Sequence, residues 1–140
     1  MSKRPVSFDM LDVLVAQGAV FRMGEPPVSG LYPCIIGGFS EQPAEQITII
    51  DGIPTIISQT FANLNLYTEP FIVSARGLTY PSAVSILQMV TSVLDSHDNF
   101  TPVGVSYRYQ NVVVSLPQTY LGRDESKRFI VEARYETRRW

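Results

Sequence analysis

The stretch PFIVSARGLTYPSAVSILQMVTSVLD, residues 70–95, decides the fold because its apolar pattern changes part-way from strand to helix. In the first part every second residue is apolar, as in a strand with one buried face. These residues are Phe71, Val73 and Ala75. Gly77 ends this pattern, and Pro81 suits the first turn of a helix, where no amide hydrogen bond is lost. We therefore expect a strand over residues 70–76.

The second part of the stretch predicts a helix over residues 81–96, because its apolar residues recur every three or four positions. They are Ala83, Val84, Ile86, Leu87, Val90, Val93 and Leu94. A stripe this apolar is unfavourable in water, so we expect the helix to pack directly on the strand that precedes it.

The chain before this unit predicts one short helix and two strands. Asp9 is placed to cap the helix and Gly18 to end it. The apolar side of this helix is formed by Leu11, Leu14 and Val15. The strands are expected over residues 31–36 and 46–52, the second closing on a turn at Asp51-Gly52.

The chain after the unit predicts three more strands. Two cover residues 104–109 and 112–116, and Pro117 ends the second. A polar turn over residues 122–127 then leads to a last strand with alternating apolar residues. These are Phe129, Val131, Ala133 and Tyr135. Two helices and five or six strands that do not alternate strictly indicate an α+β fold with a mainly antiparallel sheet.

Length and composition describe one folded domain over residues 1–140, without a second domain or an internal repeat. The chain is 45% hydrophobic and 17% charged, which is ordinary for a folded protein. No apolar run approaches the ~20 residues needed to cross a bilayer, so no membrane association is expected. The N-terminal segment has no apolar core like that of a signal peptide, which predicts synthesis in the cytoplasm. A net charge of −2 does not favour a protein that coats nucleic acid.

The only acid–base candidates for an enzyme are His97 and Cys34, the only histidine and the only cysteine. His97 lies among polar residues at the expected exit of the second helix, where a solvated loop explains it as well as a metal site does. Cys34 is flanked by apolar residues on a predicted core strand and is best interpreted as a small buried hydrophobe. We therefore expect no catalytic constellation, no cofactor and no metal site, and predict that neither residue is required for function.

Binding of nucleic acid or of a small ligand is the second class of function that the residues leave open. The run Tyr107-Arg108-Tyr109 combines aromatic and basic side chains of the kind that stack on bases. A core strand with one exposed arginine explains the same run equally well. At the C-terminal end, arginines interleave with glutamates, which favours salt bridges over a phosphate-binding track.

Residues 53–68 show no sustained period and are predicted to form a long loop or an irregular arm. They carry a large amount of apolar surface, which usually marks a partner site when it is exposed. The apolar residues are Ile53, Ile56, Ile57, Phe61, Leu64, Leu66 and Tyr67. We expect this segment to become ordered through a neighbouring subunit. The alternative is a hairpin folded back on its own sheet.

Three pieces of the chain, in order, are similar to the minor capsid or tail terminator proteins of long-tailed bacteriophages. The first is the N-terminal helix followed by the strand over residues 32–38, with Pro43 in the loop after it. The second is the apolar strand that ends in Arg76-Gly77, with Tyr80 before the amphipathic helix. The third is the turn over residues 121–128, which contains Gly-Arg-Asp and leads into the closing strand. Ser126-Lys127 departs from the family, in which many members have a glycine before the arginine.

The resemblance implies a structural virion protein that is made in the host cytoplasm and assembles into a ring, commonly a hexamer. Such a ring lies at the head-proximal end of the tail, ends growth of the tail tube and joins the tail to the head connector. The implied partners are further copies of the chain, the tail tube protein and a head-completion or connector protein, with DNA passing through the ring without sequence-specific binding. The alternatives are another neck or head-completion protein, or a non-viral α+β module that binds a ligand or nucleic acid.

A ring of identical subunits needs two different contact patches on each subunit. We expect one patch on the arm, at Ile57, Phe61 and Leu64. Polar contacts at the rim of the interface are expected from Arg76, Arg123, Asp124 and Arg128, because rim charges set the register of a contact.

Overall fold

The structure is a computed structural model, and it describes residues 4–17, 21–23, 32–39, 44–53, 55–59, 65–95, 98–101 and 109–139. The described helices are α1 (Val6–Gln17) and α2 (Tyr80–Asp95). The first five strands are β1 (Phe21–Met23), β2 (Tyr32–Ile36), β3 (Gln46–Asp51), β4 (Thr55–Gln59) and β5 (Asn65–Gly77). The last three are β6 (Asp98–Phe100), β7 (Tyr109–Arg123) and β8 (Phe129–Arg139).

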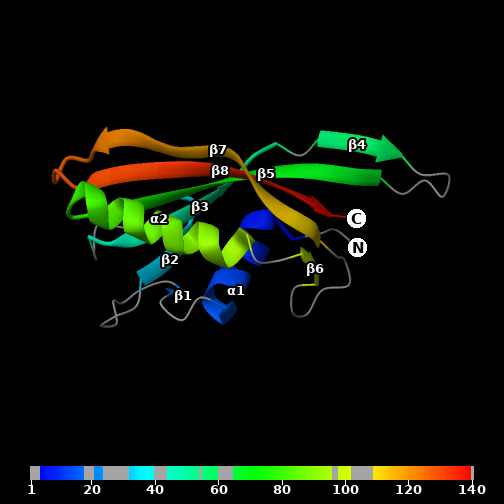
Figure 1. Ribbon diagram of the computed structural model, residues 1–140, viewed down its shortest axis with the longest axis horizontal. Helices are drawn as coiled ribbons and strands as arrows, with labels where there is room; N and C mark the ends of the chain where they lie inside the picture. Colours follow the sequence, from blue (N-terminus) through cyan, green and yellow to red (C-terminus); the bar gives the residue numbers. More distant parts are fainter. Residues whose placement is uncertain are drawn as a thin grey trace.

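The strands form one sheet in the order β1-β2-β3-β5-β8-β7-β6, and β4 pairs with β5 outside this path. The pairs β1–β2 and β2–β3 are parallel, and the remaining described pairs are antiparallel. Both helices lie on the same side of the sheet (Figure 1). This architecture confirms the predicted α+β fold. The strands that the sequence did not predict are β1, β4 and β6, which have three, five and three residues.

β5 is the strand that joins the two halves of the sheet. One of its edges pairs with β8 over residues 67–77, and its other edge pairs with β3 and then with β4. β3 and β4 therefore lie end to end along β5, as two parts of one long strand that is interrupted after Asp51. The predicted turn at Asp51-Gly52 is wrong, because β4 continues along the same edge of β5 as β3 does.

Gly52 is fixed at this interruption by the close approach of the β5 backbone. Its amide donates a hydrogen bond of 2.8 Å to the carbonyl oxygen of Pro70. A Cβ at this position would lie 2.6 Å from Cγ of Pro70, closer than packed atoms come. The glycine at position 52 thus marks a close approach to the neighbouring strand β5 and does not mark a turn.

The segment predicted as an irregular arm is an ordered hairpin in its described parts. β4 pairs antiparallel with the first residues of β5, from Thr55↔Thr68 to Gln59↔Asn65, with one irregularity between Ile56 and Ser58. This hairpin, called the arm below, extends beyond the body of the domain at one end of the long axis, and the β7–β8 turn lies at the other end (Figure 1).

The core lies between α2 and the central strands, as the stretch 70–95 predicted. Phe71, Val73 and Ala75 of β5 are fully buried. The buried face of α2 consists of Ala83, Ile86, Leu87, Val90 and Leu94. Across β5 and β8, the rings of Phe71 and Tyr135 stack with their centroids 5.2 Å apart. Burial raises the pKa of Tyr135 to about 12, and its hydroxyl lies 2.6 Å from Oγ1 of Thr91.

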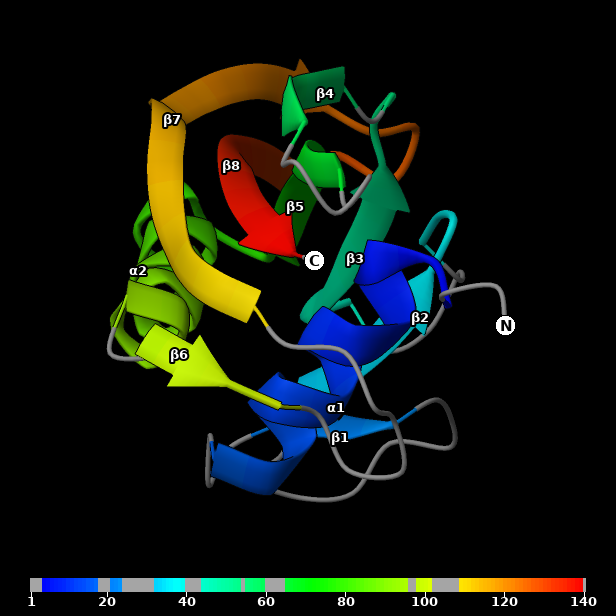
Figure 2. The ribbon, with the colours of Figure 1, turned by 90° about the vertical axis from the view of Figure 1, so that its right-hand side faces the viewer.

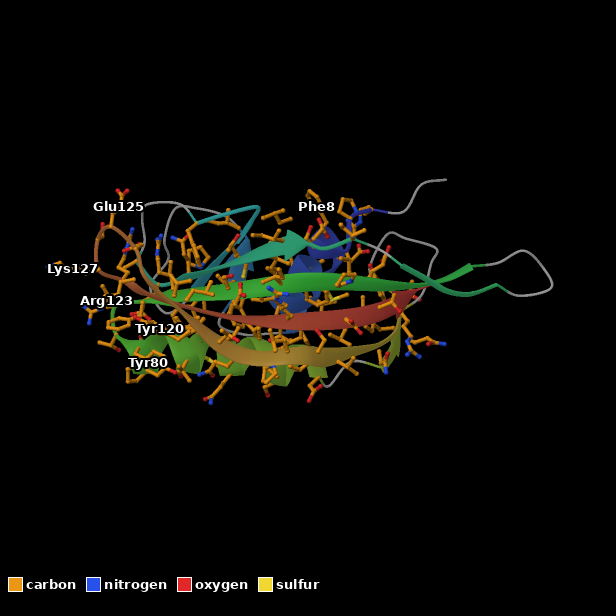
Figure 3. The ribbon with its side chains drawn as sticks, turned by 90° about the horizontal axis from the view of Figure 1, so that it is seen from above. Phe8, Tyr80, Tyr120, Arg123, Glu125 and Lys127 are labelled. Carbon is orange, nitrogen blue, oxygen red and sulfur yellow. The ribbon has the colours of Figure 1, made fainter. Side chains whose placement is uncertain are left out.

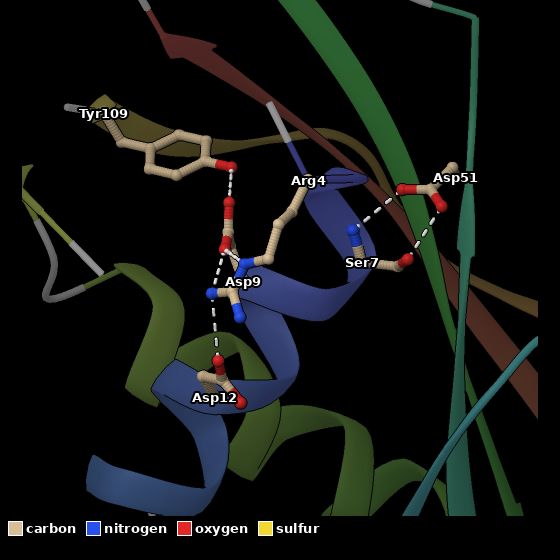
Figure 4. A network of polar contacts seen from close by, with 6 residues as sticks. All are labelled: Arg4, Ser7, Asp9, Asp12, Asp51 and Tyr109. Atoms are coloured by element: carbon tan, nitrogen blue, oxygen red, sulfur yellow. Dashed lines mark hydrogen bonds and ion pairs between the residues drawn. The ribbon is translucent and has the colours of Figure 1, made fainter. Parts of the chain in front are cut away.

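The first helix is capped by the sheet, and its own Asp9 takes a different role. Oδ1 of Asp51, at the end of β3, accepts a hydrogen bond of 2.7 Å from the Ser7 amide, and Oδ2 accepts one of 2.7 Å from the Ser7 hydroxyl (Figure 4). A carboxylate at this position satisfies an unpaired amide and complements the positive end of the helix. The prediction that Asp9 caps the helix is wrong, because Asp9 lies within α1.

Asp9 instead anchors the buried side of α1. Its side chain is fully buried, forms an ion pair with Arg4 and accepts a hydrogen bond of 2.5 Å from the hydroxyl of Tyr109 (Figure 4). Arg4 also contacts Asp12, at 3.0 Å. A buried carboxylate needs such compensation for its lost hydration, and the contact to Tyr109 ties α1 to the start of β7. Gly18, the predicted end of this helix, lies outside the described residues.

β7 corrects the prediction that a strand ends at Pro117. The described strand continues to Arg123, with pairs to β8 on both sides of the proline and four shifts of register along its length. Proline is tolerated in a strand where its missing amide is not needed, as on a sheet edge. β7 curves strongly around β8 when the sheet is viewed from its end (Figure 2). Of the strand predicted over residues 104–109, only Tyr109 lies in the described part.

Replacement of Leu87 with alanine is expected to lower the free energy of unfolding by about 2–5 kcal/mol, because the side chain is 2% exposed and packs between α2 and the sheet. Chemical denaturation measures this loss. Gln88→Ala, at the exposed neighbouring position, is the control and should stay within about 0.5 kcal/mol of the parent. Equal midpoints for the two variants would contradict the described core.

Candidate functional site

The turn between β7 and β8 is organised by the side chain of Asp124. Oδ1 of Asp124 accepts hydrogen bonds from the amides of Ser126 and Arg128, at 3.0 and 2.9 Å. Oδ2 accepts a hydrogen bond of 2.7 Å from Nε of Arg128 and lies 3.8 Å from Nη1 of Arg76. The carboxylate thus joins the end of β5 to the turn and balances the positive charges of two arginines.

Both arginines of this network are buried. Arg76 is 3% exposed and Arg128 is 9% exposed. Nε of Arg76 donates a hydrogen bond of 2.9 Å to the carbonyl oxygen of Ala44, and its guanidinium lies 4.9 Å from the ring centroid of Phe39. Burial and the charge of Arg128 lower the pKa of Arg76 from its ordinary value, against the opposing effect of Asp124. Three of the four residues predicted for the rim of an interface therefore support the turn of their own subunit.

The hydrogen bonds at Asp124 stabilise its ionised form. Partial burial raises the pKa of Asp124, but the hydrogen bonds from the Arg128 amide and side chain, the charge of Arg128 and the bond from the Ser126 amide outweigh that effect. The net result is a pKa below the ordinary value of 3.8. The contribution of ionised Asp124 to the stability of the fold is complete at pH values above the ordinary pKa. It is lost as the pH falls through the lowered pKa of the folded state.

Arg123, the fourth predicted rim residue, is exposed at the end of β7. Its guanidinium lies 4.4 Å from the ring centroid of Phe129. The centroid of the Phe129 ring lies 6.4 Å from that of Tyr80 and 6.2 Å from that of Tyr120. Tyr80 and Tyr120 meet edge to face at 5.5 Å. Figure 3 shows Tyr80, Tyr120 and Arg123 together at one end of the molecule. This end therefore presents an aromatic surface, with the Arg123 guanidinium over the Phe129 ring.

The structure describes only part of the predicted arm patch. Ile57 lies in β4, its side chain is not described, and Phe61 and Leu64 lie outside the described residues. Ile53, at the base of the arm, is 85% exposed. The arm and the Asp124 turn lie at opposite ends of the long axis (Figure 1), so the predicted interface residues do not form one patch on one subunit.

The sequence did not identify the outer part of β7 as a candidate site. Residues 113–121 are all exposed, and several are large and apolar. These are Val113, Val114, Leu116, Tyr120 and Leu121. The available signal was the absence of any charged residue from position 109 to 122. It was missed because the strand was predicted to end at Pro117.

The residues considered for enzymatic or nucleic-acid chemistry do not form a described site. Cys34 is 1% exposed on β2, as expected of a buried core residue. His97, Tyr107 and Arg108 lie outside the described residues. Tyr109 is fully buried and bonded to Asp9, so it does not present its ring to a base.

In the described part of the chain, no group of three or more histidine, cysteine, aspartate and glutamate side chains is placed to hold a metal ion. Neither of its helices is long and apolar enough to cross a membrane.

The chain has a structural relative but no match in sequence. No protein-family model matches it, and no curated protein matches it. Its fold is similar to that of a chain in the virion of a native gene transfer agent (GTA) particle. The TM-score is 0.57, the sequence identity is 11%, and the match covers 91% of this chain and 83% of the other. At this identity the similarity establishes the shared fold.

Replacement of Asp124 with asparagine is expected to lower the free energy of unfolding at pH 7 by about 1–3 kcal/mol, because Arg128 and Arg76 lose their carboxylate while remaining buried. The difference from the parent should shrink as the pH falls from about 4 through the lowered pKa of Asp124, because the carboxylate of the parent takes up its proton over that range. Denaturation at a series of pH values measures this. Glu125→Gln, at the exposed next position, should show little change; a difference for Asp124→Asn that is constant with pH would contradict the proposed ionic role.

Proposed function

We propose that this chain is a structural virion protein that forms a closed ring at the head-proximal end of a phage-type tail. The ring ends growth of the tail tube and provides the surface that joins the tail to the head connector. Its partners are further copies of itself, the tail tube protein and a head-completion protein. The fold similarity to a virion chain over 91% of the residues carries the proposal.

The distribution of contacts on the subunit supports a ring. A closed ring repeats one heterologous contact, so each subunit must offer two different patches that face opposite ways. The arm lies at one end of the long axis, and the Asp124 turn with its aromatic surface lies at the other (Figures 1 and 3). The internal network of Asp124, Arg76 and Arg128 keeps the second end rigid, which lowers the ordering cost of assembly.

A structural role also agrees with the way in which the polar residues are used. Three carboxylates of the described residues fix elements of the fold to one another: Asp51 caps α1, the buried Asp9 holds Tyr109, and Asp124 holds the turn. Each of these groups has a packing role within the subunit. We therefore assign the chain no catalytic activity and no cofactor.

The proposed function is tested in the particle to which the protein belongs. Deletion of the gene is expected to give particles that lack joined tails, together with tubes longer than the normal tail, since nothing stops polymerisation. Electron microscopy measures tube length and joining. Normal tube length with empty, unjoined heads would instead assign the chain to head completion, and normal particles would contradict a virion role.

Replacement of Ile57 and Phe61 with serine is expected to give smaller assemblies of folded subunits, because apolar side chains of the arm are removed. Light scattering measures the mass and thermal melting measures the fold. Phe8→Ser, which removes a residue of α1 that is 46% exposed, is the control and should keep the mass of the parent. An intact ring with a lower melting point would place the two side chains against their own domain.

A further inference from the structure

The outer edge of β7 lacks a neighbouring strand over most of its length in the described residues. β6 pairs with β7 only at Asp98↔Asn111 and Phe100↔Tyr109. From Val112 to Arg123 the other edge of the strand pairs with β8, and no described strand lies on the outer side. The backbone groups on that side therefore have no partner strand within the described part of the chain.

This edge has weak protection against pairing with another chain. Proteins usually block an exposed edge with charged side chains, prolines, bulges or a covering element. β7 has Pro117 and shifts of register, but no charged residue occurs from position 109 to 122. Its exposed side chains include Val113, Leu116 and Leu121. An uncharged, apolar edge is a template for an added strand.

A groove beside this edge supplies a second, independent observation. It has a volume of about 400 Å³ and lies between α2 and β7. Its walls include Leu87 and Thr91 of α2, Val114 and Pro117 of β7, and Ala133 of β8. A strand added to β7 would direct alternate side chains to the α2 side of the sheet, where this groove lies. Main-chain pairing and a side-chain groove are together the features of strand addition.

We propose that β7 of each subunit accepts β4 of a neighbouring copy as an added strand. The inference rests on the ring proposed above and names the acceptor for the arm. β4 is paired along one edge with β5, and no described strand pairs with its other edge. β4, with the sequence TIISQ, carries no charge, so neither strand repels the other.

The register of the sheet shows that this pairing must occur between two copies. β4 pairs with β5 at residues 65–68, and Thr68 in turn pairs with Arg138 of β8. The part of β7 whose outer edge has no described partner strand instead runs beside β8 from Thr137 back to Phe129, towards the opposite end of the molecule. Strands β5 and β8 also separate β4 from β7 within one subunit. A contact between these edges is therefore heterologous, and its repetition by rotation closes a ring.

Cross-linking of introduced cysteines tests the pairing. Ser115→Cys places a thiol on the exposed part of β7, and Ser58→Cys or Gln59→Cys places one on either face of β4. Since Cys34 is 1% exposed, the parent protein should not react. A short bismaleimide, which bridges thiols even when they are displaced by a residue or two, is added to the assembled protein. We expect a covalent ladder up to the full ring from one of the two double variants and only monomers from each single variant.

A charge on the edge provides the second measurement. Leu116→Lys, at a position that is 42% exposed, should lose most of the assembled mass while the subunit stays folded, because a charge blocks strand addition. Phe8→Lys is the matched control, with the same charge at 46% exposure on α1, and should assemble normally.

The outcomes distinguish this inference from the proposed function. Cross-linked dimers from Ser115→Cys alone would show pairing of two β7 strands, and loss of assembly in Leu116→Lys without any ladder would show another occupant; both results overturn β4 as the added strand. A ring that survives Leu116→Lys and gives no ladder overturns the inference and leaves the ring intact. A parent protein that never assembles overturns both proposals.

Discussion

The pairing of β5 with three other strands is the interaction on which the rest of the structure depends. One edge of β5 holds β8 over residues 67–77, and its other edge holds β3 and β4 in succession. Its buried face, with Phe71, Val73 and Ala75, receives α2. The same strand thus forms the core in one half and the arm in the other. The arm is thus a continuation of the central strand β5, paired there with β4.

The central unit could be predicted from sequence because its determinants are local. Residues 70–95 carry a period of two and then a period near 3.6, and each period identifies which side chains become buried. The closing strand β8 has the same clear alternation, and Val131, Ala133 and Tyr135 are buried as expected. Local periodicity was sufficient for these elements, in each of which one face packs on the core.

The remaining features depend on contacts between distant residues. Asp51 and Asp9 were both assigned by local rules, as a turn residue and a helix cap. In the structure Asp51 caps α1 from 44 positions away, and Asp9 accepts a hydrogen bond from Tyr109, 100 positions away. No local pattern distinguishes an aspartate that starts a turn from one that caps a remote helix. The same limitation explains why the arm was interpreted as irregular.

The candidate site could be predicted in part. The apolar content of residues 53–68 indicated an assembly element, and this segment contains the projecting arm. Arg76, Asp124 and Arg128 were selected as interface residues because they are charged; the two arginines are buried and pair with Asp124 inside their own subunit, and a contact of these residues with a neighbour stays a prediction. The outer edge of β7 was missed because an edge is defined by the absence of a neighbour, which only the sheet topology reveals.

The central claim is that the outer edge of β7 is covered in the assembled protein by a strand of another copy. Hydrogen–deuterium exchange of the amides in residues 113–121 tests it most directly, comparing the assembled parent with the dissociated Leu116→Lys variant. The account predicts slow exchange at alternate amides in the assembly, where they are hydrogen-bonded to the added strand, and fast exchange at the same amides in the variant. Equally fast exchange of these amides in both samples, with the ring intact, would contradict it.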